Sequence, residues 1–270
     1  MERAHISLGF INIYWYSIVM AVAVFAAIFL VLREAKKEKI NTDFIYDIIF
    51  FTIPSGIIGA RLYYVLFNWG EFQSNLLDIL KIWQGGLAIH GAILGGTIFI
   101  IGYCLYKHYN PLKILDIAVV GLIVGQIIGR WGNFFNQEAH GTSVSSEFLS
   151  NTLHLPFFIV NGMNINGIYH HPTFLYESVW NIFGLILLLI LRRYKKLKVG
   201  ILTCTYLIWY GVGRFFVEIL RTDSLLFFDI RMAQLVSLAM IICGIIGIII
   251  LRNCNFGPYC TTREEEKDEA

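Results

Sequence analysis

Long apolar runs recur through the whole of this chain, and they limit its fold more than any other feature does. A helix that crosses a bilayer needs about 20 predominantly apolar residues, and seven runs here approach or exceed that length. Only 15% of the 270 residues are charged, whereas about 25% are charged in soluble domains. The sequence predicts an all-α polytopic membrane protein with helices at about 15–32, 43–66, 87–106, 114–132, 173–191, 200–219 and 230–251.

Basic residues fall mainly on one side of the predicted bundle. The connections after the first, third and fifth helices and the segment after the seventh hold 14 of the 21 lysines and arginines, and the opposite side holds four. Because basic loops stay in the cytoplasm, we expect the amino terminus outside and the carboxyl terminus inside, with the first helix as an uncleaved span. Residues 1–252 then form a transmembrane bundle, with a small extracytoplasmic cap at about 133–172 between the fourth and fifth helices, and 253–270 form a cytoplasmic polar tail.

With this orientation, the charged and polar residues inside the apolar runs share one depth, in the outer half of the bilayer. Arg61, His90, Arg130 and Arg214 come from four different helices, and Asn133 follows Arg130 by three residues. An arginine in the middle of a span costs about 3 kcal/mol, and arginines grouped at one depth repel one another unless an anion lies among them. The simplest anion at that depth is a phospholipid phosphate, which the guanidinium fork can bind through two oxygens.

The sixth predicted helix has its polar residues on a single face. Tyr210, Arg214 and Glu218 follow one another at four-residue steps. Residues at this spacing are neighbours on a helix surface, so the glutamate is in position to orient the arginine and to balance part of its charge.

The fourth predicted helix carries a row of small residues, Gly121, Gly125 and Gly129, directly before Arg130. A row at four-residue steps is typical of close helix packing in membranes, and it would hold the arginine firmly at the wall of a cavity. Asp116, near the inner end of the same helix, lies away from the polar depth, and we interpret it as structural or interfacial.

Ordinary explanations exist for some of these residues. An arginine such as Arg61 can be an anchor that snorkels to the interface, and Tyr16 lies in an aromatic cluster typical of the membrane belt. His90 lies in a glycine-rich stretch inside a span, which favours function. Among other functions, an anion transporter should have paired broken helices in two related halves, which the sequence does not show. A transferase that uses nucleotide-activated lipids needs a cluster of aspartates. A scaffold role leaves the energetic cost of polar residues inside the spans unexplained.

Six stretches rich in these residues follow one another from the first helix to the loop after the sixth. They are "WYS" at 15–17, "GARLYYVLFNW" at 59–69, "GGLAIHGAILGG" at 85–96, "GRWGNFFNQEAHG" at 129–141, "HPTFLYES" at 171–178 and "YGVGRFFVEILRTDS" at 210–224. In this order they resemble the motifs of the bacterial prolipoprotein diacylglyceryl transferases, and the resemblance covers nearly the whole chain.

The resemblance implies that the diacylglyceryl group of phosphatidylglycerol is transferred to the lipobox cysteine of a prelipoprotein, with release of glycerol phosphate. The implied partners are phosphatidylglycerol, prelipoprotein signal peptides and the lipid bilayer, without nucleic acid. The implied location is the bacterial cell membrane, with the active site toward the outer leaflet. The residues implied as catalytic are His90, Arg130, Arg214, Glu138, Tyr210 and Glu218, and those implied as binding phosphatidylglycerol are Arg130, Asn133, Arg214, Tyr16, Arg61 and Gly141.

The residues leave the identity of the general base open. The attacking thiol is mostly protonated near neutral pH, so a positioned base accelerates its attack. His90 is our first candidate, while Glu138 and Glu218 either orient the arginines or act as the base themselves. We expect no metal or cofactor, because the outer segments have no carboxylate, His or Cys array at ligand spacing.

Overall fold

The computed structural model describes residues 5–7, 12–73, 75–194, 197–222, 226–227 and 230–253. These residues belong to two compact units. The first unit is formed by Met1–Val31 and Asp116–Ala270, and the second by Leu32–Leu115. Except for Asn253, the predicted tail at 253–270 lies outside the described residues.

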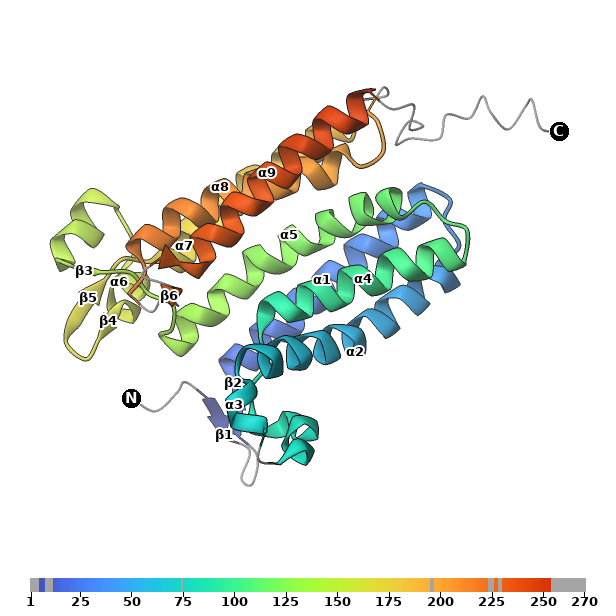
Figure 1. Ribbon diagram of the computed structural model, residues 1–270. Coiled ribbons are helices and arrows are strands. Elements are labelled where there is room, and N and C mark those ends of the chain that lie inside the picture. The colour runs from blue at the N-terminus through green and yellow to red at the C-terminus, as the bar shows by residue number, and fades with distance from the viewer. Residues whose placement is uncertain are drawn as a thin grey trace. The chain divides into compact units, whose positions relative to one another are not determined.

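Each predicted apolar run coincides with one long helix (Figure 1). The ends differ from the sequence prediction by a few residues, as in the first run, whose helix continues through Lys37, and in the fourth, whose helix continues through Asn136. Asn133 is therefore helical and does not belong to the connection that follows. In the described residues, the long helices are α1 (Trp15–Lys37), α2 (Thr42–Phe67), α4 (Ile89–Tyr106), α5 (Pro111–Asn136), α7 (Thr173–Leu191), α8 (Ile201–Leu220) and α9 (Met232–Asn253).

Five of these helices, α1, α2, α5, α7 and α9, are long and apolar enough to cross a membrane. The described apolar part of α4, Gly91–Tyr106, is shorter, and α8 is not among the five. The prediction of an all-α polytopic membrane protein is therefore confirmed in its main feature.

Short strands, which an all-α prediction does not include, occur outside the long helices. β1 (His5–Ser7) pairs with β2 (Asn12–Tyr14), and β6 (Leu226–Phe227) pairs with β7 (Ile230–Arg231), both antiparallel. Between α5 and α7, a three-stranded sheet has the order β3-β5-β4. Its strands are β3 (Ser143–Val144), β4 (Asn164–Ile165) and β5 (Ile168–His170), and the further short helices are α3 (Trp69–Phe72), η1 (Leu76–Leu80), η2 (Ile82–Gln84), η3 (Phe148–Thr152) and α6 (Phe157–Gly162).

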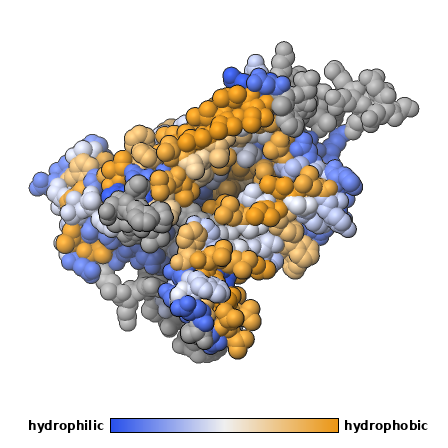
Figure 2. Space-filling model, viewed as in Figure 1, coloured by the Kyte–Doolittle hydropathy of each residue, from blue (hydrophilic) through white to orange (hydrophobic). Residues whose placement is uncertain are grey.

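The long helices expose large apolar side chains. Phe25 and Phe29 on α1 are 70% and 63% exposed, and Phe50 on α2 is 69% exposed. Figure 2 shows apolar residues covering much of α9. Soluble monomers rarely expose apolar surface on this scale, and a lipid environment explains it.

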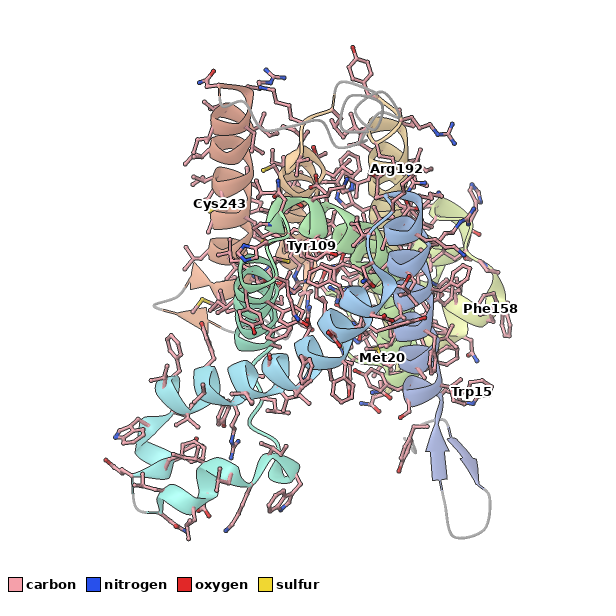
Figure 3. The ribbon with its side chains drawn as sticks, turned by 90° about the vertical axis from the view of Figure 1, so that its right-hand side faces the viewer. Trp15, Met20, Tyr109, Phe158, Arg192 and Cys243 are labelled. Atoms are coloured by element: carbon pink, nitrogen blue, oxygen red, sulfur yellow. The ribbon has the colours of Figure 1, made fainter. Side chains whose placement is uncertain are left out.

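α1 packs against the predicted row of small residues on α5. A Cβ built on Gly121 would lie 2.7 Å from the carbonyl oxygen of Ala27, and one on Gly129 would lie 3.7 Å from Sδ of Met20. Met20 and Trp15 lie along α1 in Figure 3. The predicted close approach of another helix to this row is thus confirmed, and its partner is the first helix.

α7 and α8 are locked together by a reciprocal pair of tryptophans. Nε1 of Trp180 donates to the carbonyl oxygen of Trp209 at 2.9 Å, and Nε1 of Trp209 donates to that of Trp180 at 3.0 Å. The two rings stack 4.4 Å apart. Each indole lies on a glycine of the other helix, Trp180 on Gly213 and Trp209 on Gly184, where a Cβ would collide with it. This arrangement fixes both the spacing and the register of the two helices.

In the second unit, α2 and α4 cross through their glycines. A Cβ on Gly59 would lie 2.8 Å from Cα of Gly95, and one on Gly95 would lie 2.5 Å from the carbonyl oxygen of Ser55. Farther along the pair, the hydroxyl of Tyr103 donates to Oδ2 of Asp47 at 2.6 Å. Backbone-to-backbone contact of this kind is typical of glycine-rich membrane helix pairs.

Asp116 on α5 caps the amino terminus of α8. Its Oδ2 accepts from the backbone nitrogen of Gly200 at 2.6 Å, and its Oδ1 accepts from the backbone nitrogen of Thr203 at 2.8 Å and the hydroxyl of Thr203 at 2.6 Å. Gly200, at the cap position, has no side chain to serve these donors. The structural role predicted for Asp116 is confirmed, and it ties α5 to α8.

Replacing Asp116 with alanine should destabilise the protein by about 3 kcal/mol, because several buried donors lose a charged acceptor. Thermal unfolding in detergent measures the loss. Asp43→Ala, at an exposed position in the first turn of α2, is the matched control and should cost less than about 1 kcal/mol. Equal losses in the two variants would contradict the capping role.

Candidate active site

Four arginines and two glutamates form a connected network in the first unit. Glu177 on α7 bridges two of the arginines, with Oε2 2.6 Å from Nη2 of Arg130 and Oε1 3.1 Å from Nη1 of Arg214. Glu218, one turn after Arg214 on α8, lies 2.6 Å from Nη2 of that arginine. Because both carboxylates are nearly inaccessible to solvent, their charges depend on these partners.

Two further arginines surround Glu218. Nε of Arg221 lies 4.0 Å from its Oε2, and Nη1 of Arg231 donates to its backbone carbonyl oxygen. These six side chains, four arginines and two glutamates among the described residues, carry a formal charge of +2. An excess of positive charge at this place favours an anionic ligand.

The network lies where the tryptophan pair holds α7 and α8 in register. Glu177 is three residues before Trp180 on α7, and Arg214 directly follows Gly213 on α8. Locking Trp180 onto Gly213 therefore brings Glu177 opposite Arg214. Ser178, next to Glu177, donates to the carbonyl oxygen of Ile127 on α5 at 2.6 Å and joins the third helix to the pair.

Tyrosines on α8 extend the network toward α5. Arg130 donates through Nη2 to the hydroxyl of Tyr210 at 3.3 Å. One turn away on both helices, Nε2 of Gln126 donates to the hydroxyl of Tyr206 at 2.7 Å. The predicted polar face of α8 is thus confirmed, since Tyr210, Arg214 and Glu218 all join the same network.

A small pocket lies one turn beyond the network, at the carboxyl end of α5. It contains two of the predicted site residues, Asn133 and Glu138, on its wall. The backbone nitrogen of Glu138 donates to the carbonyl oxygen of Asn133 at 3.0 Å, which closes the end of the helix. The complete lining is Asn133, Phe134, Gln137, Glu138, His140, Met163, Ile165, Thr173 and Phe174.

Gly141 lies where the segment after α5 meets both α7 and α8. Its backbone nitrogen donates to the carbonyl oxygen of His171 at 3.0 Å, and it forms an antiparallel bridge with Arg221. A Cβ at this position would lie 2.6 Å from Cβ of His171 and 3.2 Å from the carbonyl oxygen of Leu220. The missing side chain is therefore required for packing, and the predicted contact of Gly141 with phosphatidylglycerol stays a prediction.

Histidines line the same junction. Nδ1 of His170 lies 2.9 Å from the carbonyl oxygen of Gly141, and the ring of His170 lies 4.1 Å from that of His140. Burial lowers the pKa of His171, whose Nδ1 lies 3.0 Å from the hydroxyl of Tyr176. These contacts join the segment after α5 to the start of α7.

Tyr16, predicted to bind the lipid headgroup, is the second residue of α1. Its ring lies over Gly132 on α5, where a Cβ would be 3.0 Å from Cδ2 of the tyrosine. Gly132 is two residues after Arg130 and one before Asn133. Packing on glycine thus brings the tyrosine to the stretch of α5 that carries both predicted residues.

Arg61 belongs to the second unit, where it is 7% exposed and holds the segment between α2 and α4. Its Nε donates to the carbonyl oxygen of Ile79 at 2.8 Å, and its Nη2 donates to that of Asp78 at 2.6 Å. Its Nη1 donates to the carbonyl oxygens of Gly85 and Gly86 at 2.7 and 3.0 Å. All three nitrogens therefore bind backbone and position this segment, and the predicted contact of Arg61 with phosphatidylglycerol stays a prediction.

His90 is the second residue of α4, and its side chain lies outside the described residues. Its neighbour Gly91 contacts α2, with a Cβ there meeting the backbone of Gly59 and Ala60. The proposed role of His90 as the base therefore stays a prediction.

Glu177 is the residue that sequence reasoning missed, although "HPTFLYES" was among the motifs. The available signal was its cost, because a carboxylate five residues into an apolar helix requires a cationic partner. Arg221 and Arg231 are two of the four basic residues on the predicted outer side, and the sequence assigned them no other role. Nothing in the spacing of these three residues pointed to Arg130, which is 47 residues before Glu177 on another helix.

The arrangement can bind a phosphate group. Two guanidinium groups from different helices, with side chains 19% and 15% exposed, are held at one place by a carboxylate behind them. Such a pair can bind an anion through several charge-assisted hydrogen bonds and can stabilise negative charge that develops during a reaction.

Comparisons with known proteins identify sequences that are similar over nearly the whole chain. The model of the family described as prolipoprotein diacylglyceryl transferase matches residues 3–250. A phosphatidylglycerol–prolipoprotein diacylglyceryl transferase of Listeria welshimeri is 47% identical over 258 residues, which cover 96% of this chain and 92% of that protein. The enzyme of the same name from Bacillus cytotoxicus is 48% identical over 252 residues, which cover 93% of each chain.

Replacing Gly141 with alanine should weaken the junction of the segment after α5 with α7 and α8. Forcing a methyl group into occupied space typically costs about 1–3 kcal/mol, so the thermal unfolding temperature in detergent should fall. Gly102→Ala on α4, where a Cβ would meet nothing within 4 Å, is the control and should be neutral or stabilising. An unchanged unfolding temperature for the Gly141 variant would show that the junction tolerates a side chain.

Proposed function

The chain belongs to the prolipoprotein diacylglyceryl transferase family, and from this premise we propose that it transfers the diacylglyceryl group of phosphatidylglycerol to the cysteine of prelipoproteins. The relatives are named for this reaction. The observation that carries the proposal for the site is the pair Arg130 and Arg214, joined by Glu177 on apolar helices. A phospholipid is the anion that reaches arginines on membrane helices.

We propose that all seven long helices span the bacterial cell membrane, with the amino terminus outside. The five most apolar helices and the uneven distribution of basic residues support this topology. The carboxyl ends of α5 and α8 and the beginning of α7 then face the outside. The arginine network lies near these ends, at a depth that the headgroups of the outer leaflet can reach.

In the proposed reaction, the thiol sulfur of the prelipoprotein attacks the glycerol carbon of phosphatidylglycerol that carries the phosphate oxygen. A carbon–sulfur bond forms, the carbon–oxygen bond breaks, and glycerol phosphate leaves with the bonding electrons. The proton of the thiol passes to a base. The products are a thioether-linked diacylglyceryl group and a phosphomonoester, and no redox change occurs.

The arginine network suits the charge that develops in this step. A phosphodiester carries one negative charge, and the departing phosphomonoester approaches two near neutral pH. The formal charge of the network, +2, matches the second state better than the first. Arg130 and Arg214 would therefore stabilise the transition state more than the bound lipid, which is the requirement for catalysis.

The remaining predicted residues are assigned around this pair. Tyr210 orients Arg130 through its hydroxyl, and Glu218 orients Arg214. Asn133 and Tyr16 donate to the oxygens of the headgroup. His90 removes the proton of the thiol, while Glu138 and Glu218 are the alternative bases, the latter with its Oε2 against Arg214 and Arg221.

The direct test of the function uses purified protein with phosphatidylglycerol and a lipobox peptide in detergent. Mass spectrometry should detect a diacylglyceryl adduct on the cysteine, together with released glycerol phosphate. An anion transporter would give no adduct under these conditions. A peptide that stays unmodified in the presence of folded protein would refute the proposed function.

Arg130→Lys and Arg214→Lys should each lower kcat/KM for phosphatidylglycerol by about 100-fold, because lysine keeps the charge but loses the bidentate contact. Arg193→Lys, an exposed position after α7, is the control and should leave the rate unchanged. The rate of adduct formation measures the effect. Near-normal rates in both variants would refute the proposed binding of the phosphate by Arg130 and Arg214.

His90→Gln should lower kcat by about 100-fold or more, because the thiol loses its base, while KM for phosphatidylglycerol changes little. His154→Asn is the control, since His154 is exposed and asparagine suits its positive φ of 49°. Turnover of the His90 variant at the wild-type rate would remove this residue from the role and leave Glu138 or Glu218 as the base.

A further inference from the structure

Glu177 contacts both proposed phosphate-binding arginines at once. Its two oxygens are divided between them, Oε2 to Arg130 at 2.6 Å and Oε1 to Arg214 at 3.1 Å. The glutamate itself is 5% exposed, whereas the arginine side chains keep 19% and 15% of their surface. The carboxylate therefore lies behind the guanidinium groups and binds them from the protein side.

A carboxylate that bridges two guanidinium groups makes the same kind of contact as a phosphate does. Both ligands offer negatively charged oxygens to guanidinium groups, and Glu177 offers one oxygen to each of the two arginines. Glu177 is attached to the same chain as the arginines, so it competes at a high effective concentration that dilution does not reduce. Nη2 of Arg130 and Nη1 of Arg214 each have two N–H groups, and phosphate oxygens that take the N–H group directed at Glu177 displace it.

The net charge of the network determines how this competition affects binding of the product. With Glu177 ionised, the network carries +2, and without it the charge would be +3 against a leaving phosphomonoester that approaches two negative charges. A site with that excess would hold the product more tightly than the substrate, because the product carries the larger charge. A competing carboxylate counteracts this retention.

We propose that Glu177 is a positioning residue that competes with phosphate for Arg130 and Arg214 and so promotes release of the glycerol phosphate product. The inference rests on the proposed function, which supplies the product. In the empty site Glu177 sets the separation of the two arginines. After the transfer it regains its contacts as glycerol phosphate leaves.

The test is product inhibition in the variant Glu177→Gln, which keeps the shape of the side chain and removes its charge. Glycerol phosphate should inhibit the full-length variant at roughly tenfold lower concentration than the wild type, because the phosphate no longer displaces a charged competitor. kcat should fall while KM for phosphatidylglycerol stays equal or falls. Glu147→Gln, which removes an exposed charge in the segment between α5 and α7, should leave the inhibition constant unchanged.

A merely structural role for Glu177 predicts a different pattern. Thermal stability and kcat would then fall together, with an unchanged inhibition constant for glycerol phosphate, and this result would overturn the proposal. If the glutamine variant does not fold, Glu177→Asp decides the question, because its shorter carboxylate reaches only one arginine at a time. Inhibition stronger than in the wild type supports the competition, and wild-type inhibition contradicts it.

The same experiment separates this inference from the proposed function. A wild-type protein that forms no adduct on the peptide refutes the function itself. A wild-type protein that forms the adduct, together with an inhibition constant that the Glu177 variants do not change, refutes only the role of Glu177.

Discussion

The bridge of Glu177 between Arg130 and Arg214 is the interaction on which the rest of the site depends. Charged groups on apolar helices are tolerated only when they are paired, and breaking such a pair leaves an uncompensated charge. The bridge also joins α5, α7 and α8, since each helix contributes one of its members. The same contact therefore balances the buried charges and determines where two arginines can meet a ligand.

The geometry of the bridge depends on packing that carries no charge. The tryptophan pair can form only because Gly184 and Gly213 leave room for the indoles, and it sets the register that brings Glu177 opposite Arg214. At the other end of α8, Asp116 fixes its amino terminus to α5. Glycines and caps, rather than polar contacts alone, give the arginines their positions, as the proposed electrostatic catalysis requires.

The fold could be predicted well from hydrophobic runs, because each run must satisfy its backbone hydrogen bonds as a helix in lipid. The run at 114–132 lies within the observed α5, and another helix does approach its small residues closely, although the sequence did not indicate which helix. The short strands were not predicted. β3, β4 and β5 have only two or three residues each, too few for a periodic pattern to separate them from loop.

The residues of the site were only partly accessible to the same reasoning. The stripe of Tyr210, Arg214 and Glu218 is local, since four-residue spacing alone makes its members neighbours on one helix. Arg61 has a local sequence that looks like that of any polar residue near a span end. Its four bonds to backbone carbonyls depend on how residues 78–86 turn back toward α2.

The sequence by itself determined that the chain forms long apolar helices, which residues share a helix face and which family its motifs resemble. These properties depend on composition and on spacing within one helix. Only the tertiary structure decided that Glu177 meets Arg130 and Arg214, and that Gly141 is needed for close packing. Contacts between helices depend on how the helices pack in register. Glu177 and Arg130 are 47 residues apart, and a spacing of that length does not reveal the register.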